Sequence, residues 1–123
     1  VPGATGYIDT NYEGKAAAAI EALKTRDFVY LHLEGMDEVS HEQNVRKKIQ
    51  AIEDFDSRVV APVLKAFKVD ELNVAVLPDH PVPIATGKHT RDPVPVAVRK
   101  VGMTPDAVWP MTKYPADPAP WAP

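Results

Sequence analysis

The 123-residue sequence predicts an α/β domain with a mostly parallel sheet and flanking helices. Two short apolar runs, residues 28–33 and 72–77, have the continuous hydrophobic pattern of strands that are covered on both faces. Between them, residues 40–67 carry apolar side chains at helical spacing. The order strand, helix, strand indicates a right-handed βαβ unit, and such units build parallel sheets.

The composition is that of a folded domain. Hydrophobic residues make up 45% of the chain and charged residues 25%, which is a globular balance. A net charge of −3 offers no attraction to nucleic acid or to an anionic membrane, and no apolar run reaches the roughly 18 residues of a membrane span. The chain has no Cys, which excludes disulfides and thiolate ligands and agrees with a reducing cytoplasm.

The first predicted helix covers residues 11–24 and follows a loop over residues 1–10. Its Ala-rich sequence has a high intrinsic helix propensity. Asp9, Thr10 or Asn11 is suited to cap its N-terminus, because a short polar side chain can accept a hydrogen bond from a free backbone N–H group.

The second predicted helix covers residues 40–67 and contains Pro62. Because proline removes a backbone donor, we expect a kink or an interruption there. A last strand is predicted over residues 94–98, and Pro93 and Pro95 favour an edge position for it.

The segment from Thr104 to the C-terminus contains six prolines and both tryptophans. Such a sequence forms neither a long helix nor a central strand. We therefore expect residues 104–123 to be an extended strap or a weakly ordered end, separate from the domain over residues 1–103.

Acidic and imidazole side chains follow the predicted strands. Asp37 and His41 come after the first strand and are four residues apart, so a helical turn places them on one face. Asp79 and His80 directly follow the second strand, and His89 lies in the loop before the last one. Ligands of open α/β sheets bind beyond the carboxyl ends of the strands. Carboxylate and imidazole together suit Zn²⁺ or Mn²⁺, so these side chains are candidate metal ligands.

These motifs resemble the archaeal-type, 2,3-bisphosphoglycerate-independent (cofactor-independent) phosphoglycerate mutases of the alkaline phosphatase superfamily. The matching stretches are GATGYIDTN (3–11), DFVYLHLE (27–34), DEVSH (37–41), LPDH (77–80) and HTRDPVP (89–95). The resemblance covers residues 3–98 in the order of the family. It implies an alkaline phosphatase-like three-layer sandwich, of which this chain would be a C-terminal part.

The resemblance also implies two divalent metal ions (Mn²⁺, Zn²⁺ or Mg²⁺) that hold a phosphoryl group side by side. Asp37, His41 and His89 would bind the first ion, and Asp79 and His80 would supply part of the second site. Family members complete the second site with an aspartate near the N-terminus and with a serine or threonine nucleophile.

Neither of these last two groups has a counterpart in this sequence. The only serines are Ser40, inside the metal motif, and Ser57, on the predicted long helix. Since the chain also begins with Val1 and not with Met, we expect it to be a part of a longer cytoplasmic enzyme, inactive by itself.

The implied reaction interconverts 3-phosphoglycerate and 2-phosphoglycerate through a phosphoenzyme. Arg91 would contact the substrate phosphate, and a salt bridge to Asp92 or another acid is an equal alternative. Two other functions stay open: a phosphomonoesterase or homoserine-kinase-like enzyme with the same metals, and a non-catalytic α/β binding domain. Neither nucleic acid nor a membrane is an expected partner. Unpaired strand edges of an incomplete sheet would favour a homo-oligomer.

Overall fold

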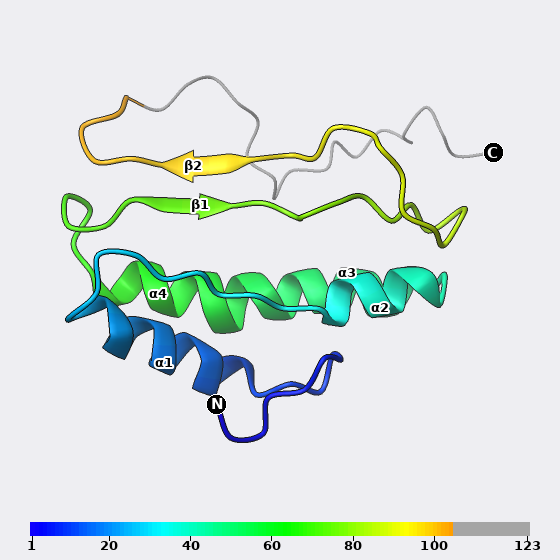
Figure 1. Cartoon of the computed structure of the whole chain (residues 1–123), viewed down its shortest axis with the longest axis horizontal. Coiled ribbons are helices and arrows are strands. Elements are labelled where there is room, and N and C mark those ends of the chain that lie inside the picture. The colour runs from blue at the N-terminus through cyan, green and yellow to red at the C-terminus, as the bar shows by residue number, and fades with distance from the viewer. Residues whose placement is uncertain (105–123) are drawn as a thin grey trace.

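The computed structural model describes residues 1–104 and places short helices beside a two-stranded sheet (Figure 1). The elements in chain order are α1 (Tyr12–Leu23), α2 (Gly35–His41), α3 (Val45–Phe55), the π-helical turn η1 (Asp56–Val60), α4 (Ala61–Ala66), β1 (Val74–Val76) and β2 (Ala97–Arg99). The rod formed by α3, η1 and α4 crosses the middle of the molecule, with α1 on one side and the sheet on the other (Figure 1). The predictions for residues 105–123 lie outside the described residues.

The first predicted helix is confirmed as α1. Asn11 caps it, because its Oδ1 accepts a hydrogen bond from the backbone N–H of Gly14 at 2.8 Å. Glu13 in the first turn accepts two hydrogen bonds from Arg58 of η1, at 2.6 and 2.9 Å, which hold the pKa of Glu13 below its usual value. The Arg58 guanidinium also lies over the ring of Tyr12, so α1 is tied to the central rod.

The prediction of one continuous helix over residues 40–67 is wrong at its start. The first metal motif forms a separate helix, α2, which ends at His41. Gln43 then has a left-handed backbone with φ 55°, and Asn44 caps the new helix α3 with its side chain. A left-handed residue followed by an N-cap ends one helix and starts another. Asp37 and His41 therefore lie on a short helix of their own.

The predicted interruption at Pro62 takes the form of a change in helix type. The chain widens into the π-helical turn η1 directly before the proline and continues as α4. A proline ring collides with the carbonyl group four residues earlier in a regular α-helix. The wider turn relieves that collision and keeps the rod continuous.

The predicted parallel pairing is not found for β1 and β2. They pair antiparallel, with Ala75 opposite Val98. Among residues 1–104 the connection between them contains no helix, whereas a parallel pair is usually joined by a crossover helix. The predicted strand over residues 28–33 is extended but pairs with no strand in the described part of the chain.

The extended segment (residues 28–33) still shows the two-residue alternation of a strand. Leu31 and Leu33 pack against the buried core, whereas Phe28 is 79% exposed and Tyr30 is 70% exposed. The segment thus has one face covered by the helices and one open face. Figure 1 shows it as the extended trace that leads into α2.

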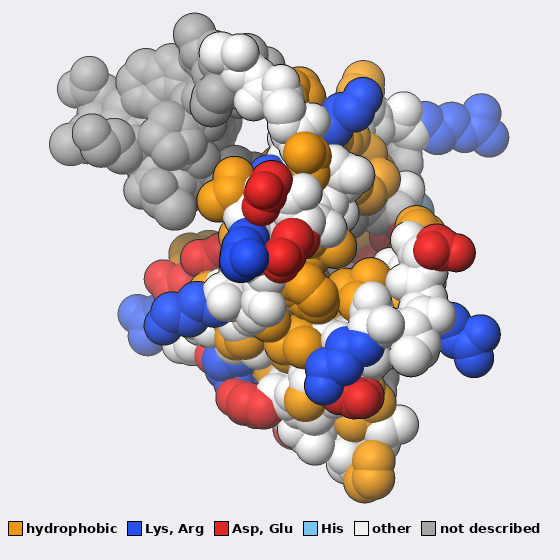
Figure 2. Space-filling view, turned by 90° about the vertical axis from the view of Figure 1, so that its left-hand side faces the viewer, with side chains coloured by type: hydrophobic (Ala, Val, Ile, Leu, Met, Phe, Trp, Pro, Cys, Tyr) orange, Lys and Arg blue, Asp and Glu red, His pale blue; other side chains and the backbone are white. Residues whose placement is uncertain are grey.

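The core lies between α1 and the central rod and is centred on Tyr12, Ala16 and Val59. A second buried point is Val39, on the inner face of α2. Figure 2 shows hydrophobic side chains exposed between the charged ones along the middle of one face. No helix among residues 1–104 has the length and apolar character needed to cross a membrane.

Candidate metal centre

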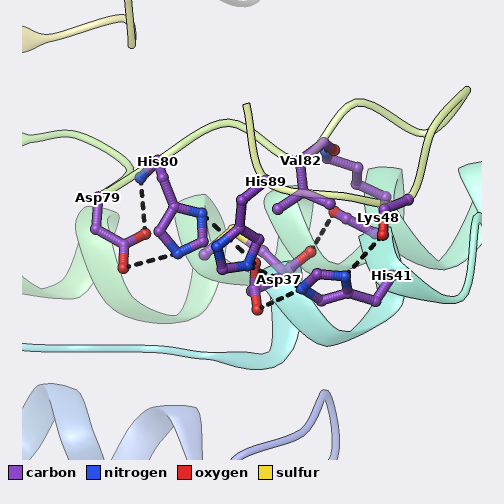
Figure 3. Close-up of polar contacts among 10 residues, drawn as sticks. Asp37, His41, Lys48, Asp79, His80, Val82 and His89 are labelled. Carbon is purple, nitrogen blue, oxygen red and sulfur yellow. Dashed lines mark hydrogen bonds and ion pairs between the residues drawn. The ribbon is translucent and has the colours of Figure 1, made fainter. Parts of the chain in front are cut away.

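Asp37, His41 and His89 meet at one point beside α2 (Figure 3). The first two project from adjacent turns of α2, and His89 reaches them from the loop between β1 and β2. His41 Nε2 lies 3.2 Å from Asp37 Oδ2 and 3.0 Å from His89 Nε2. His89 Nε2 lies 3.5 Å from Asp37 Oδ1. The structure thus brings together the three residues predicted for the first ion.

The spacing and chemistry of these three side chains fit a divalent metal ion. Two ligand atoms about 2.0–2.1 Å from Zn²⁺ at a tetrahedral angle lie roughly 3.4 Å apart. One carboxylate and two imidazoles form a donor set that suits Zn²⁺ or Mn²⁺. Asp37 Oδ1 is buried and has no hydrogen-bond partner among residues 1–104. A buried carboxylate oxygen without a partner is costly, and a bound cation would remove that cost.

The orientation of His41 is set from outside the cluster. Its Nδ1 donates a hydrogen bond to the carbonyl oxygen of Gly87 at 2.8 Å. Because a carbonyl only accepts, this bond assigns a ring proton to Nδ1, and in the neutral ring the Nε2 lone pair then faces Asp37. Gly87 has φ 59°, and a Cβ there would lie 3.1 Å from the backbone oxygen of His41. Glycine therefore permits the close approach that this hydrogen bond needs.

His80 joins the same cluster, and Asp79 lies at its margin. The rings of His80 and His89 stack with centroids 3.7 Å apart, and His80 Nδ1 is 3.8 Å from Asp37 Oδ1. This Nδ1 is also buried without a hydrogen-bond partner among residues 1–104. Within residues 1–104, the hydrogen bond and ion pair of the Asp79 carboxylate are both with His80: Oδ1 accepts from the backbone N–H at 2.9 Å, and Oδ2 lies 3.2 Å from Nε2.

Arg91 is exposed. Within residues 1–104 it forms no hydrogen bond or ion pair, so the alternative salt bridge to Asp92 is not formed there. Its contact with a substrate phosphate stays a prediction.

Lys48 is a site residue that the sequence does not single out. It is half-buried, and its Nζ donates to the carbonyl oxygen of Val82 at 2.8 Å (Figure 3). Burial lowers the pKa of Lys48, and the negative charge of Asp37 opposes that shift. Its neighbour Lys47 is bonded instead to Tyr7 and Glu42, which raise the pKa of Lys47 to about 12. No sequence signal separates these adjacent lysines, because the difference arises from a loop 34 residues away.

Comparison with known proteins agrees with a metal site. The chain matches the model of the metalloenzyme superfamily over residues 1–114. It is 59% identical over 111 residues to the 2,3-bisphosphoglycerate-independent phosphoglycerate mutase of Methanosarcina acetivorans, covering 88% of this chain and 28% of that protein. It is 48% identical over 94 residues to the protein of the same name from Saccharolobus solfataricus, covering 76% and 22%.

Among solved structures, the PH0037 protein of Pyrococcus horikoshii superposes with a TM-score of 0.82 at 35% identity. The match covers 85% of this chain and 32% of that one. The chain therefore spans less than a third of the length of these relatives. Because the superfamily model matches most of its length, the chain belongs to the metalloenzyme superfamily.

Proposed function

We propose that this chain is the metal-binding segment of a metal-dependent, 2,3-bisphosphoglycerate-independent phosphoglycerate mutase. The observation that carries the proposal is the convergence of Asp37, His41 and His89 around a buried carboxylate oxygen that has no hydrogen-bond partner within residues 1–104. The names of the mutase relatives support the reaction class. Since those proteins extend well beyond this chain, the activity belongs to the longer protein.

In this proposal Asp37, His41 and His89 hold one divalent ion, and His80 and Asp79 supply part of a second site. Bound ions stabilise negative charge on phosphoryl oxygens and favour deprotonation of an attacking hydroxyl. The chain itself fixes the positions of the donor atoms, as the Gly87 carbonyl does for the His41 ring.

In this proposal the attacking hydroxyl comes from the remainder of the longer protein, and both serines of this chain are engaged by helix backbone. Ser40 is 1% exposed and donates to the carbonyl oxygen of Met36 at 2.5 Å. Ser57 donates to the carbonyl oxygen of Glu53 at 2.7 Å. We therefore expect no mutase activity from this chain alone.

The substrate pair of the proposal is 3-phosphoglycerate and 2-phosphoglycerate in the cytoplasm, with Arg91 contacting the phosphate. Assaying the longer protein with 3-phosphoglycerate and Mn²⁺ tests this assignment. Formation of 2-phosphoglycerate supports a mutase. Release of inorganic phosphate without 2-phosphoglycerate would instead indicate a phosphomonoesterase that uses the same metals.

Calorimetric titration of the metal-stripped chain tests the ion site directly. With Mn²⁺ or Zn²⁺ we expect saturable binding near one ion per chain. The His89→Ala variant should bind at least about tenfold more weakly, because one of three donors is lost. His32→Ala is the matched control, since His32 is an exposed histidine on the extended segment, outside the cluster. A folded chain that binds neither ion would contradict the site.

We further propose that the extended segment (residues 28–33) is a strand of a mostly parallel sheet in an alkaline phosphatase-like three-layer sandwich. Its side-chain alternation, and the exposed Phe28 and Tyr30 on its open face, support this reading. The neighbouring strand would come from the remainder of the longer protein, over which the relatives extend.

Hydrogen exchange is expected to reveal this pairing. In the chain alone, the amides of Val29 and Leu31 should exchange fast, because neither donates a backbone hydrogen bond among residues 1–104. In the longer protein they should slow by at least about 100-fold, while the amide of Ala19 in α1 is protected in both. Equal rates in the two proteins would contradict the sheet. Protection that rises with the concentration of the chain alone would show a homo-oligomer that pairs this edge.

A further inference from the structure

Within residues 1–104, the hydrogen bonds that hold the loop between His80 and His89 are accepted by its backbone carbonyl groups. We call residues 81–87 the carbonyl loop. The backbone N–H of Thr90 donates to the oxygen of Pro81 at 3.1 Å, and that of Gly87 donates to the oxygen of Pro83 at 2.8 Å. These bonds give the loop its shape. Four further hydrogen bonds, from three residues of the α2–α3 region, fix its position relative to the helices.

Gln43 makes two of the bonds between the helices and the carbonyl loop. Its Nε2 donates to the carbonyl oxygens of Ile84 and Ala85, at 3.0 and 3.1 Å. The residue sits between α2 and α3 in a left-handed conformation, which is unfavourable for a side chain other than Gly, Asn or Asp. The same side chain lies against Gly87, where a Cβ would come within 2.9 Å of Gln43 Cγ. The break between the two helices thus directs this amide at the loop.

Lys48 makes the next contact, to the carbonyl oxygen of Val82 at 2.8 Å. Val82 is 5% exposed, so this anchor lies at the buried edge of the loop. A half-buried ammonium group near Asp37 opposes cation binding electrostatically. The positive charge of Lys48 therefore disfavours a bound cation. Its hydrogen bond, in contrast, positions the loop between His80 and His89.

We infer that Gln43 and Lys48 are positioning residues, which hold the carbonyl loop against α2 and α3 and thereby set His80 and His89 opposite Asp37. The fourth hydrogen bond, from His41 to Gly87, joins a proposed metal ligand to the same loop. The inference rests on the proposed function, because it assigns these residues a role in the metal site of that proposal.

The variants Gln43→Glu and Lys48→Met distinguish a positioning role from an electrostatic one, because the two roles predict opposite changes in Mn²⁺ affinity. Each makes the surroundings of the site more negative, so electrostatics alone predicts tighter Mn²⁺ binding. Loss of the loop anchor predicts weaker binding. Lys48→Arg keeps a donor and should restore part of the affinity. Lys47→Met removes the same charge one residue earlier, where the lysine binds Tyr7 and Glu42, not the loop.

Two measurements on the 123-residue chain decide the matter: Mn²⁺ titration, and hydrogen exchange of residues 81–90 in the metal-free protein. We expect a dissociation constant about tenfold higher in Gln43→Glu and in Lys48→Met, with faster exchange of the loop, and no change in Lys47→Met. Unchanged or tighter Mn²⁺ binding would overturn the inference, and so would unchanged loop exchange.

The result remains decisive if the proposed function is wrong or a variant does not fold. If the original chain binds no Mn²⁺, the metal site fails, and loop exchange alone decides on positioning: faster exchange supports it and equal exchange overturns it. If Gln43→Glu does not fold, the comparison of Lys48→Met with Lys48→Arg takes its place.

Discussion

Replacing Asp37 with Asn is expected to abolish Mn²⁺ binding while leaving the metal-free chain as stable as before, or more stable. Asp37 is the residue that all three clustered imidazoles face: His41 and His89 at 3.2 and 3.5 Å, and His80 at 3.8 Å. Its Oδ1 is buried without a hydrogen-bond partner among residues 1–104. At a pH where free imidazole is neutral, a neutral amide of the same shape costs less to bury than this carboxylate.

The expected loss of affinity is at least about 100-fold, because the site loses its only negative ligand. Thermal unfolding with and without Mn²⁺ measures both effects. Mn²⁺ at 100 times the dissociation constant of the original chain should stabilise that chain by about 2.7 kcal/mol and the variant by about 0.4 kcal/mol or less. Glu38→Gln serves as the matched control, since Glu38 is an exposed carboxylate on the same helix. An Asp37→Asn chain that Mn²⁺ stabilises as strongly as the original would contradict the assigned ligand.

The core of this site was predictable from the sequence, because its geometry is largely local. Two residues four apart on a helix share a face wherever the helix begins, so Asp37 and His41 remained together although α2 starts and ends elsewhere than expected. His80 and His89 reached the cluster although the two strands beside them pair antiparallel. What brings them there is the folding of the loop they flank.

The parts that could not be predicted depend on contacts distant in the sequence. Lys48 and Gln43 gain their roles from carbonyl groups about 34 to 42 residues away, and carbonyl groups carry no sequence signal. The helix break at Gln43 has no Gly or Pro to mark it. Its one local sign is Asn44, a residue type suited to an N-cap, which lies inside an otherwise continuous helical pattern.

For the strands too, the local conformation could be predicted from the sequence, whereas the pairing with distant residues could not. Alternation along residues 28–33 follows from the sequence, and the structure confirms an extended segment with one covered face. In the proposed sheet, its neighbouring strand comes from the remainder of the longer protein, so this chain's pattern alone does not identify that strand. The direction of β2 depends on a connection without a crossover helix, which hydrophobic periodicity does not report.

Replacing Tyr12 with Ala is expected to lower the free energy of unfolding by about 3–5 kcal/mol, as truncation of a buried aromatic ring does. Tyr12 is 2% exposed and forms the centre of the core with Ala16 and Val59. Its ring also lies 4.6 Å from the Arg58 guanidinium carbon, so the truncation removes a cation–π contact between α1 and η1. Small domains have only about 5–15 kcal/mol of stability, and this loss is a large share of it.

Urea unfolding of three variants separates the core effect from the loss of a tyrosine as such. Tyr30→Ala, at a tyrosine that is 70% exposed, should change stability by about 0.5 kcal/mol or less. Tyr12→Phe keeps the ring and should retain most of the stability. Equal losses in Tyr12→Ala and Tyr30→Ala would contradict the core assignment. Tyr12 lies in the core between α1 and η1, whereas the proposed metal ligands lie on α2 and on the loop beyond β1. Tyr12→Phe should therefore bind Mn²⁺ like the original chain. Stability and metal affinity should change independently.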